Sequence, residues 1–225
     1  MIHGELLKKD SVITISQMDD YWNTRFVNEK LMWGIEPSNV AKKCEPIFKE
    51  NNVRNILIMG AGYGRNGKYF TENGYNVDGI EYSMEAINLG KIFCPEIHFI
   101  EGSVLDIKLN KKYDALFCYS IMHLFQKNDR ETFMRNCISH CNENGIIVIS
   151  CFSVKDKTFG IGTKIEENTF EIKKGKIVHF FDEEEIINIS SKLIVIKYDY
   201  VQEKIETKDR IEEYNMIYGI YKKGK

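Results

Sequence analysis

Short, mainly apolar runs alternate along this chain with segments in which apolar residues recur at helical spacing. A continuous run such as 55–59 is typical of a strand that is buried on both faces, because such a strand has no polar face. The strands predicted in this way cover residues 55–59, 75–80, 97–100, 113–119 and 145–151.

Between these strands the apolar spacing predicts helices, and serine residues mark two of their starts. Ser38 and Ser83 each precede an apolar face, in the position of a helix cap. The predicted helices cover residues 39–50, about 65–72, 84–93 and about 129–141. Strands that alternate with helices favour right-handed crossovers and a doubly wound, parallel sheet.

The pattern changes after the fifth strand. Residues 153–181 are mostly polar and too long for an ordinary connection, and such insertions are often functional. A short helix is predicted over 182–190, where early acidic residues suit the helix dipole. The runs 193–201 and 214–221 predict two strands joined by a charged linker, Glu203 to Glu213. No helix intervenes, so we expect an antiparallel pair.

Composition limits the class of protein. The 225 residues, 43% of them hydrophobic, suit a single α/β domain over 1–225, and the net charge of -2 gives no positive field for nucleic acid or anionic membranes. The start, Met1 to Glu5, has no basic and apolar leader, so a cytoplasmic protein is expected. The six cysteines are predicted to be reduced core thiols. Cys137 and Cys141, with His140 between them, are the best metal-like group, but no matching ligand pair exists and no metal is predicted.

The segment Gly60-Ala61-Gly62-Tyr63-Gly64 directly follows the first predicted strand. Glycines there let the backbone approach a nucleotide, and the next helix offers free N–H donors. Glu81 ends the following strand, where a carboxylate accepts hydrogen bonds from ribose hydroxyls. Gly62 to Gly67 also matches the dinucleotide fingerprint, but the first glycine after the strand is Gly60 and a second nucleotide-binding half is missing. Both observations argue against a dinucleotide, and an NAD-dependent oxidoreductase is kept as the alternative.

With this loop, Glu81 and the terminal strand pair, residues 38–225 resemble class I S-adenosylmethionine (SAM)-dependent methyltransferases. The resemblance implies a Rossmann-like, seven-stranded, mostly parallel sheet with an antiparallel C-terminal strand and helices on both faces. It also implies SAM as cofactor and S-adenosylhomocysteine as product. Two positions depart from the family pattern, since Ile58 and Ser103 stand where acids are common. The cofactor contacts implied for the core are Gly60, Ala61, Gly62, Glu81, Tyr82, Ser103, Val104, Leu105 and Tyr119.

The N-terminal aromatic residues resemble the opening of the thiopurine and tellurite-resistance branch of these enzymes. There the N-terminal segment folds over the cofactor, which implies a lid at residues 1–37, with a short helix over 17–25. Trp22, Trp33 and Arg25 are implied cofactor contacts, with the Arg25 guanidinium facing the methionine carboxylate. The alternatives are packing roles for the two tryptophans and a solvated charge for Arg25.

Methyl transfer mainly requires alignment of the acceptor and exclusion of water, so a catalytic base is optional. Tyr119 ends the fourth strand and His123 follows it, and both are expected beside the acceptor, with His123 as the candidate catalytic residue. A capping or core role for His123 is the alternative. His179 and Phe180 are expected to form a wall over the acceptor, or else to anchor the next helix.

The same region lacks the motifs of nucleic-acid amino methyltransferases and of pyrimidine C5 methyltransferases. We therefore expect a small-molecule acceptor bearing a thiol, metalloid, amine or hydroxyl group, no nucleic-acid or membrane partner, and a monomer or homodimer. A SAM-binding module without catalysis is a further alternative.

Overall fold

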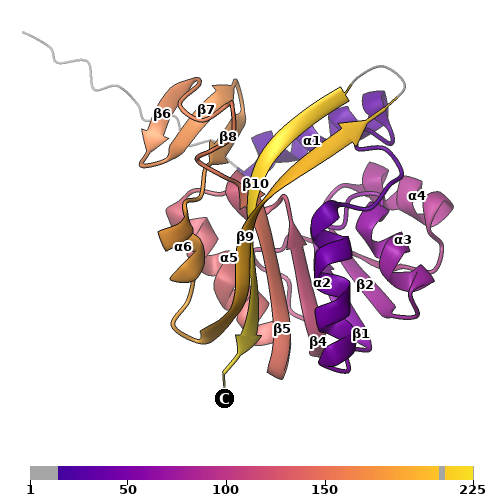
Figure 1. Ribbon diagram of the computed structural model, residues 1–225. Coiled ribbons are helices and arrows are strands. Elements are labelled where there is room, and N and C mark those ends of the chain that lie inside the picture. Colours follow the sequence, from indigo (N-terminus) through magenta and orange to yellow (C-terminus); the bar gives the residue numbers. More distant parts are fainter. Residues whose placement is uncertain (1–14, 208–210, 225) are drawn as a thin grey trace, which may run out of the picture.

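A seven-stranded sheet lies at the centre of the computed structural model, which describes residues 15–207 and 211–224 (Figure 1). The strand order is β3-β2-β1-β4-β5-β10-β9, and β10 runs antiparallel to both of its neighbours. The predicted seven-stranded, mostly parallel sheet with an antiparallel C-terminal strand is confirmed. The strands are β1 (Asn55–Met59), β2 (Asn76–Glu81), β3 (His98–Glu101), β4 (Tyr113–Tyr119), β5 (Cys141–Phe152), β9 (Leu193–Glu206) and β10 (Ile211–Lys223).

Helices cover both faces of this sheet (Figure 1). Phe48 and Phe70 are buried against one face, and Phe133 is buried against the other. The two predicted caps are present: the hydroxyl of Ser38 accepts from the Ala41 N–H at 3.1 Å, and that of Ser83 accepts from Ala86 at 3.3 Å. The helices are α1 (Ile15–Glu29), α2 (Asn39–Glu50), α3 (Arg65–Glu72), α4 (Met84–Phe93), the 3₁₀ turn η1 (Met122–Leu124), α5 (Lys127–His140) and α6 (Glu183–Ile187).

The polar insertion forms a second, small sheet of three antiparallel strands, β6 (Thr163–Glu166), β7 (Thr169–Lys173) and β8 (Lys176–His179). Its last strand contacts η1. In Figure 1 the small sheet, α1 and the connecting end of the β9–β10 hairpin lie beyond the same edge of the main sheet. This is the edge at which the parallel strands end.

The prediction of a charged linker from Glu203 to Glu213 is wrong. Strand β9 continues to Glu206 and β10 begins at Ile211, and these two residues are paired. Glu203 and Ile205 are buried while Lys204 between them is exposed, which is the two-residue period of a strand with one solvent-exposed face. The buried Glu203 carboxylate has a partner, because it accepts hydrogen bonds from two N–H groups at the start of α2.

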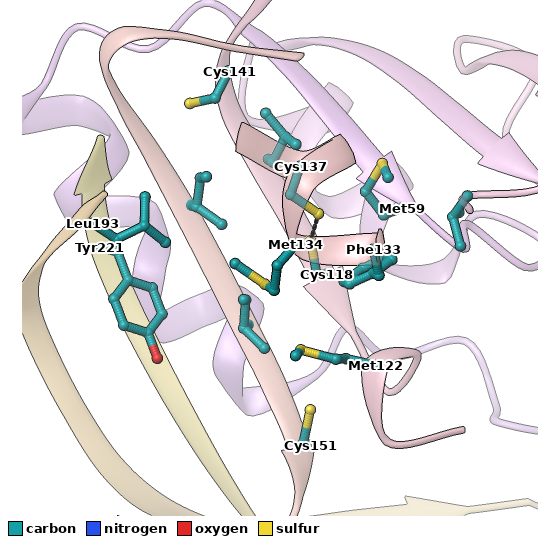
Figure 2. Close-up of a cluster of buried hydrophobic side chains, with 14 of the residues drawn as sticks. Met59, Cys118, Met122, Phe133, Met134, Cys137, Cys141, Cys151, Leu193 and Tyr221 are labelled. Atoms are coloured by element: carbon teal, nitrogen blue, oxygen red, sulfur yellow. Dashed lines mark hydrogen bonds between the residues drawn. The ribbon is translucent and has the colours of Figure 1, made fainter. Parts of the chain in front are cut away.

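The thiols lie inside the packed core, as Figure 2 shows for the cluster around α5. All six cysteines are free and buried. Cys118 and Cys137 are in contact, with their sulfur atoms 3.7 Å apart. Among residues 15–207 and 211–224, no group of His, Cys, Asp and Glu residues is arranged to hold a metal ion. No helix in these ranges is long and apolar enough to span a bilayer.

Candidate functional site

One pocket opens at the carboxyl edge of the main sheet, and it is lined by residues of α1, of the strand ends and of the small sheet. Every residue that the sequence suggested as a cofactor contact lines it, and so does His123. The residues brought together in this way are Trp22, Arg25, Trp33, Gly60, Ala61, Gly62, Glu81, Tyr82, Ser103, Val104, Leu105 and Tyr119. Residues 1–14 of the predicted lid lie outside the described residues.

The glycine loop turns sharply between β1 and α3. Gly60 and Gly62 have φ angles of +77° and +55°, which only glycine adopts without strain. A Cβ atom on Gly60 would lie 2.4 Å from the Cδ1 atom of Ile121, and one on Gly62 would lie 3.2 Å from the Trp33 ring. The loop backbone is therefore held close to two other parts of the pocket wall.

Glu81 fixes this loop while it lines the pocket. Its carboxylate accepts hydrogen bonds from the N–H groups of Gly62 at 2.7 Å, Tyr82 at 2.9 Å and Ser83 at 2.9 Å. Burial raises the pKa of Glu81, and these three donors act in the opposite direction. A carboxylate offers about four lone-pair positions, so three N–H donors leave capacity for a ligand hydroxyl. The residues present therefore fit a ribose-bearing cofactor.

The segment after α1 is attached to the glycine loop through Tyr63. The Tyr63 hydroxyl donates to the Gly34 carbonyl at 2.5 Å and accepts from the Trp33 N–H at 3.1 Å. The rings of Trp33 and Tyr63 are stacked, with centroids 5.9 Å apart, and Phe26 meets Trp33 edge-on at 5.6 Å. Burial raises the pKa of Tyr63 to about 12, so its hydroxyl keeps its proton at neutral pH.

Arg65 makes a second link of the same kind, and the sequence reasoning assigned it no role. Its buried guanidinium donates to the carbonyls of Trp33 at 3.2 Å and Glu36 at 3.1 Å, and lies 5.6 Å from the centre of the Tyr119 ring. An arginine in the first turn of a helix opposes the helix dipole. That unfavourable position was a signal that Arg65 has partners outside α3.

Arg25 lines the pocket but already has a partner. Its guanidinium makes two hydrogen bonds to the Glu29 carboxylate one turn further along α1, at 2.8 and 2.9 Å. The guanidinium also lies 5.6 Å from the centre of the Trp22 ring. A carboxylate ligand facing Arg25 would therefore meet a cation that Glu29 has partly neutralised.

His123 stands in η1 with its side chain almost completely buried, and its Nδ1 atom has no hydrogen-bond partner among the described residues. Its ring packs against Phe152, with centroids 4.5 Å apart. Burial lowers the pKa of His123 to about 3, and the charges of Lys176 and His179 add to this effect. The imidazole is therefore neutral at physiological pH, with a polar nitrogen to offer a ligand.

The structure does not bring His179 and Phe180 into the pocket lining. His179 is buried between the Thr169 hydroxyl at 2.7 Å and the Glu185 carboxylate at 2.9 Å. Phe180 packs behind Phe152, with centroids 6.1 Å apart. The pocket is instead completed by residues that the sequence reasoning missed, Phe152, Lys176, Ile205, Glu212, Tyr214 and Met216.

The sequence of the central part matches a known family. A model of the methyltransferase domain matches residues 56–145, which run from β1 to the start of β5. The ubiquinone biosynthesis O-methyltransferase of Rickettsia canadensis (strain McKiel) is 23% identical over 132 residues, or 57% of this chain and 55% of that protein. The chain spans about half the length of the curated relatives that it matches first.

Solved structures resemble nearly the whole chain. The 1,6-didemethyltoxoflavin-N1-methyltransferase of Burkholderia thailandensis, solved with 1,6-didemethyltoxoflavin and S-adenosylhomocysteine, has a TM-score of 0.71 and 14% identity, over 99% of this chain and 94% of that chain. TehB from Haemophilus influenzae has a TM-score of 0.62 and 13% identity, over 92% and 67% of the two chains. At these identities the likeness establishes the fold.

Proposed function

We propose that the chain is a class I SAM-dependent methyltransferase and that it transfers a methyl group from SAM to a small-molecule acceptor. The main support is the convergence of the glycine loop, Glu81 and the aromatic residues of the N-terminal segment on one pocket. These elements are far apart in the sequence, and a carboxylate, a close backbone and an aromatic cover in one pocket support the binding of a ribose-bearing cofactor.

Within this proposal, Gly60 to Gly62 lie along the methionine and ribose, and Glu81 accepts the ribose hydroxyls. Tyr82 and Leu105 flank the adenine. SAM, when bound, supplies an electrophilic methyl group on a sulfonium. What the chain adds is alignment and exclusion of water, which are the main requirements of an in-line displacement.

The walls of the pocket suit the exclusion of water. Phe26, Trp33 and Tyr63 pack together over the glycine loop, and Phe152 packs against Tyr214 with centroids 5.2 Å apart. In such surroundings the lone pair or N–H of a neutral imidazole is worth more than in water, because no solvent competes for it. We infer that the neutral His123 imidazole orients the acceptor group through a hydrogen bond, since a pKa of about 3 makes it a weak base.

For the acceptor, the proposal names a set of chemical groups and not a single atom. Thiol, metalloid, amine and hydroxyl groups all remain candidates, and a hydroxyl is favoured because the first relatives carry the name O-methyltransferase. A monomeric or homodimeric state and a cytoplasmic location stay predictions.

Two measurements test the proposal. Calorimetric titration should give saturable binding of S-adenosylhomocysteine and no binding of NADH. The opposite result would contradict the proposal and favour an NAD-dependent oxidoreductase. Incubation with methyl-labelled SAM and a panel of thiols, metalloid oxyanions, amines and phenols should then transfer label to at least one acceptor. Binding without transfer to any of them would identify a SAM-binding module without catalysis.

A further inference from the structure

Lys176 brings a cation into the pocket from the small sheet. It begins β8, the strand that contacts η1, so its side chain lines the same pocket as His123. Its ammonium group makes no hydrogen bond or ion pair with any residue that the structure describes. A partly buried lysine without a partner is unfavourable unless a ligand supplies the opposite charge.

The surroundings of Lys176 strengthen this argument. Burial lowers its pKa to about 8, and the nearby cations Arg25 and Lys173 act in the same direction, against Glu212 and Asp156. Glu212 is also hydrogen-bonded to the Tyr214 hydroxyl. At neutral pH most of the ammonium is charged and poorly hydrated, so an anion that entered the pocket would be attracted to it.

A second residue of the pocket lining, His123, also has an unsatisfied polar atom. His123 Nδ1 is buried and has no partner among residues 15–207 and 211–224. Flat aromatic surfaces line the pocket as well, since Phe152 contacts both the His123 ring and the Tyr214 ring. An apolar pocket with a few fixed polar groups selects a ligand that has matching polar groups on an apolar body.

We propose that the acceptor is an aromatic acid, whose ring lies against Phe152 and Tyr214, whose anionic group pairs with Lys176, and whose hydroxyl hydrogen-bonds to His123 Nδ1. This inference rests on the proposed function and narrows its acceptor to a class. It assigns Lys176 as the residue that selects an acidic acceptor over a neutral one of the same shape.

Matched pairs of probes test this selectivity by binding alone. The 2-, 3- and 4-hydroxybenzoates carry a carboxylate, and the corresponding hydroxybenzamides have nearly the same shape without the charge. We expect at least one acid to bind about tenfold more tightly than its amide, which corresponds to about 1.4 kcal/mol for a charge-assisted contact. Calorimetry is performed with and without saturating S-adenosylhomocysteine.

Two variants assign the preference to its residue. Lys176→Gln should reduce the difference between acid and amide to less than about twofold, since the carboxylate then has no cation to pair with. Lys173→Gln removes a neighbouring lysine of the small sheet that does not line the pocket, and should keep the preference. S-adenosylhomocysteine should bind both variants as it binds the unmodified protein.

The proposal is overturned if no hydroxybenzoate binds more tightly than its amide, or if Lys176→Gln leaves the preference intact. A loss of S-adenosylhomocysteine affinity in Lys176→Gln would also overturn it, because Lys176 would then face the methionine carboxylate. Failure of the unmodified protein to bind S-adenosylhomocysteine would contradict the proposed function instead. The titrations without this ligand would still measure the preference for an acid.

Discussion

The hydroxyl of Tyr63, in the glycine loop, donates a 2.5 Å hydrogen bond to the carbonyl of Gly34, in the segment that follows α1. The same oxygen accepts from the Trp33 N–H at 3.1 Å, and the rings of Trp33 and Tyr63 are stacked. The loop that is expected to hold the cofactor therefore also holds the cover over it. We therefore expect the Tyr63 side chain to couple cofactor binding to the position of the N-terminal segment.

We predict that Tyr63→Phe lowers the affinity for S-adenosylhomocysteine by about tenfold. The ring stack with Trp33 remains, but two backbone groups of the covering segment lose their partner, at about 0.5–1.5 kcal/mol each. Calorimetric titration measures the affinity. Tyr69→Phe on α3 is the control, because Tyr69 does not line the pocket. Equal affinities for the two variants would show that the covering segment does not depend on the Tyr63 hydroxyl.

Replacement of Gly60 separates the shape of the loop from backbone strain. Gly60 and Gly74 have φ angles of +77° and +87°, so alanine at either position should lower the free energy of unfolding by about 1–2 kcal/mol. Only at Gly60 does the new Cβ meet a neighbour, Ile121, whose side chain lines the pocket. Urea denaturation should thus give a loss for Gly60→Ala at least as large as that for Gly74→Ala, while only Gly60→Ala weakens S-adenosylhomocysteine binding. Weaker binding by Gly74→Ala as well would point to a general effect of destabilisation.

The strands, helix caps and glycine loop that position the site could be predicted, because each depends on residues that are close together in the sequence. The run 55–59 became β1 with the same bounds, and Ser38 and Ser83 cap α2 and α4 through hydroxyl contacts within one helical turn. The glycine loop and Glu81 belong to two neighbouring parallel strands, β1 and β2, whose ends must lie at the same edge. Their meeting therefore followed from the order of the elements.

The residues on the acceptor side of the pocket could not be predicted in the same way. They depend on which face of a strand each residue occupies and on contacts between residues that are far apart in the sequence. Residues two apart in β8 share a face, so Lys176 and His179, three apart, point to opposite sides. Lys176 lines the pocket and His179 does not. No pattern in residues 153–181 indicated which face of β8 would point into the pocket. Glu203 likewise accepts from Val40, 163 residues earlier, which no local pattern indicates.

Glu81→Gln should weaken both the cofactor site and the fold. The amide has one oxygen in place of two, so at least one of the N–H groups of Gly62, Tyr82 and Ser83 is left without an acceptor. We expect a loss of about 1–3 kcal/mol in the free energy of unfolding, and at least about a tenfold loss in affinity for S-adenosylhomocysteine. Urea denaturation and calorimetry measure the two effects.

Glu101→Gln provides the matched control for this change. Glu101 is paired with Glu81 on the neighbouring strand β3, but it is exposed and does not line the pocket. Its replacement should leave both quantities unchanged. If Glu81→Gln kept full affinity, the ribose hydroxyls would have to be bound elsewhere.

His123 should make the fold less stable as the pH falls. Its pKa lies at about 3 in the folded chain against an ordinary value of 6.5, so between these values the unfolded chain binds a proton that the folded chain does not. The stabilisation is complete above about pH 6.5 and is lost as the pH falls towards 3, by at most about 1.4 kcal/mol per pH unit. The measurement is the free energy of unfolding in urea at a series of pH values.

Carboxylates also titrate in this pH range. The prediction therefore concerns the difference in pH dependence between the unmodified protein and its variants. His123→Gln has no imidazole to protonate, and its unfolding free energy should fall less steeply between pH 6.5 and 4 than that of the unmodified protein. His140→Gln removes another buried imidazole, one that lies outside the pocket lining, and controls for the substitution itself. Proton NMR provides an independent test, since the ring signals of His123 should stay those of a neutral imidazole down to about pH 4. A midpoint near 6.5 would mean that His123 is open to water, and its unpartnered nitrogen would then be a solvated atom instead of a contact for the acceptor.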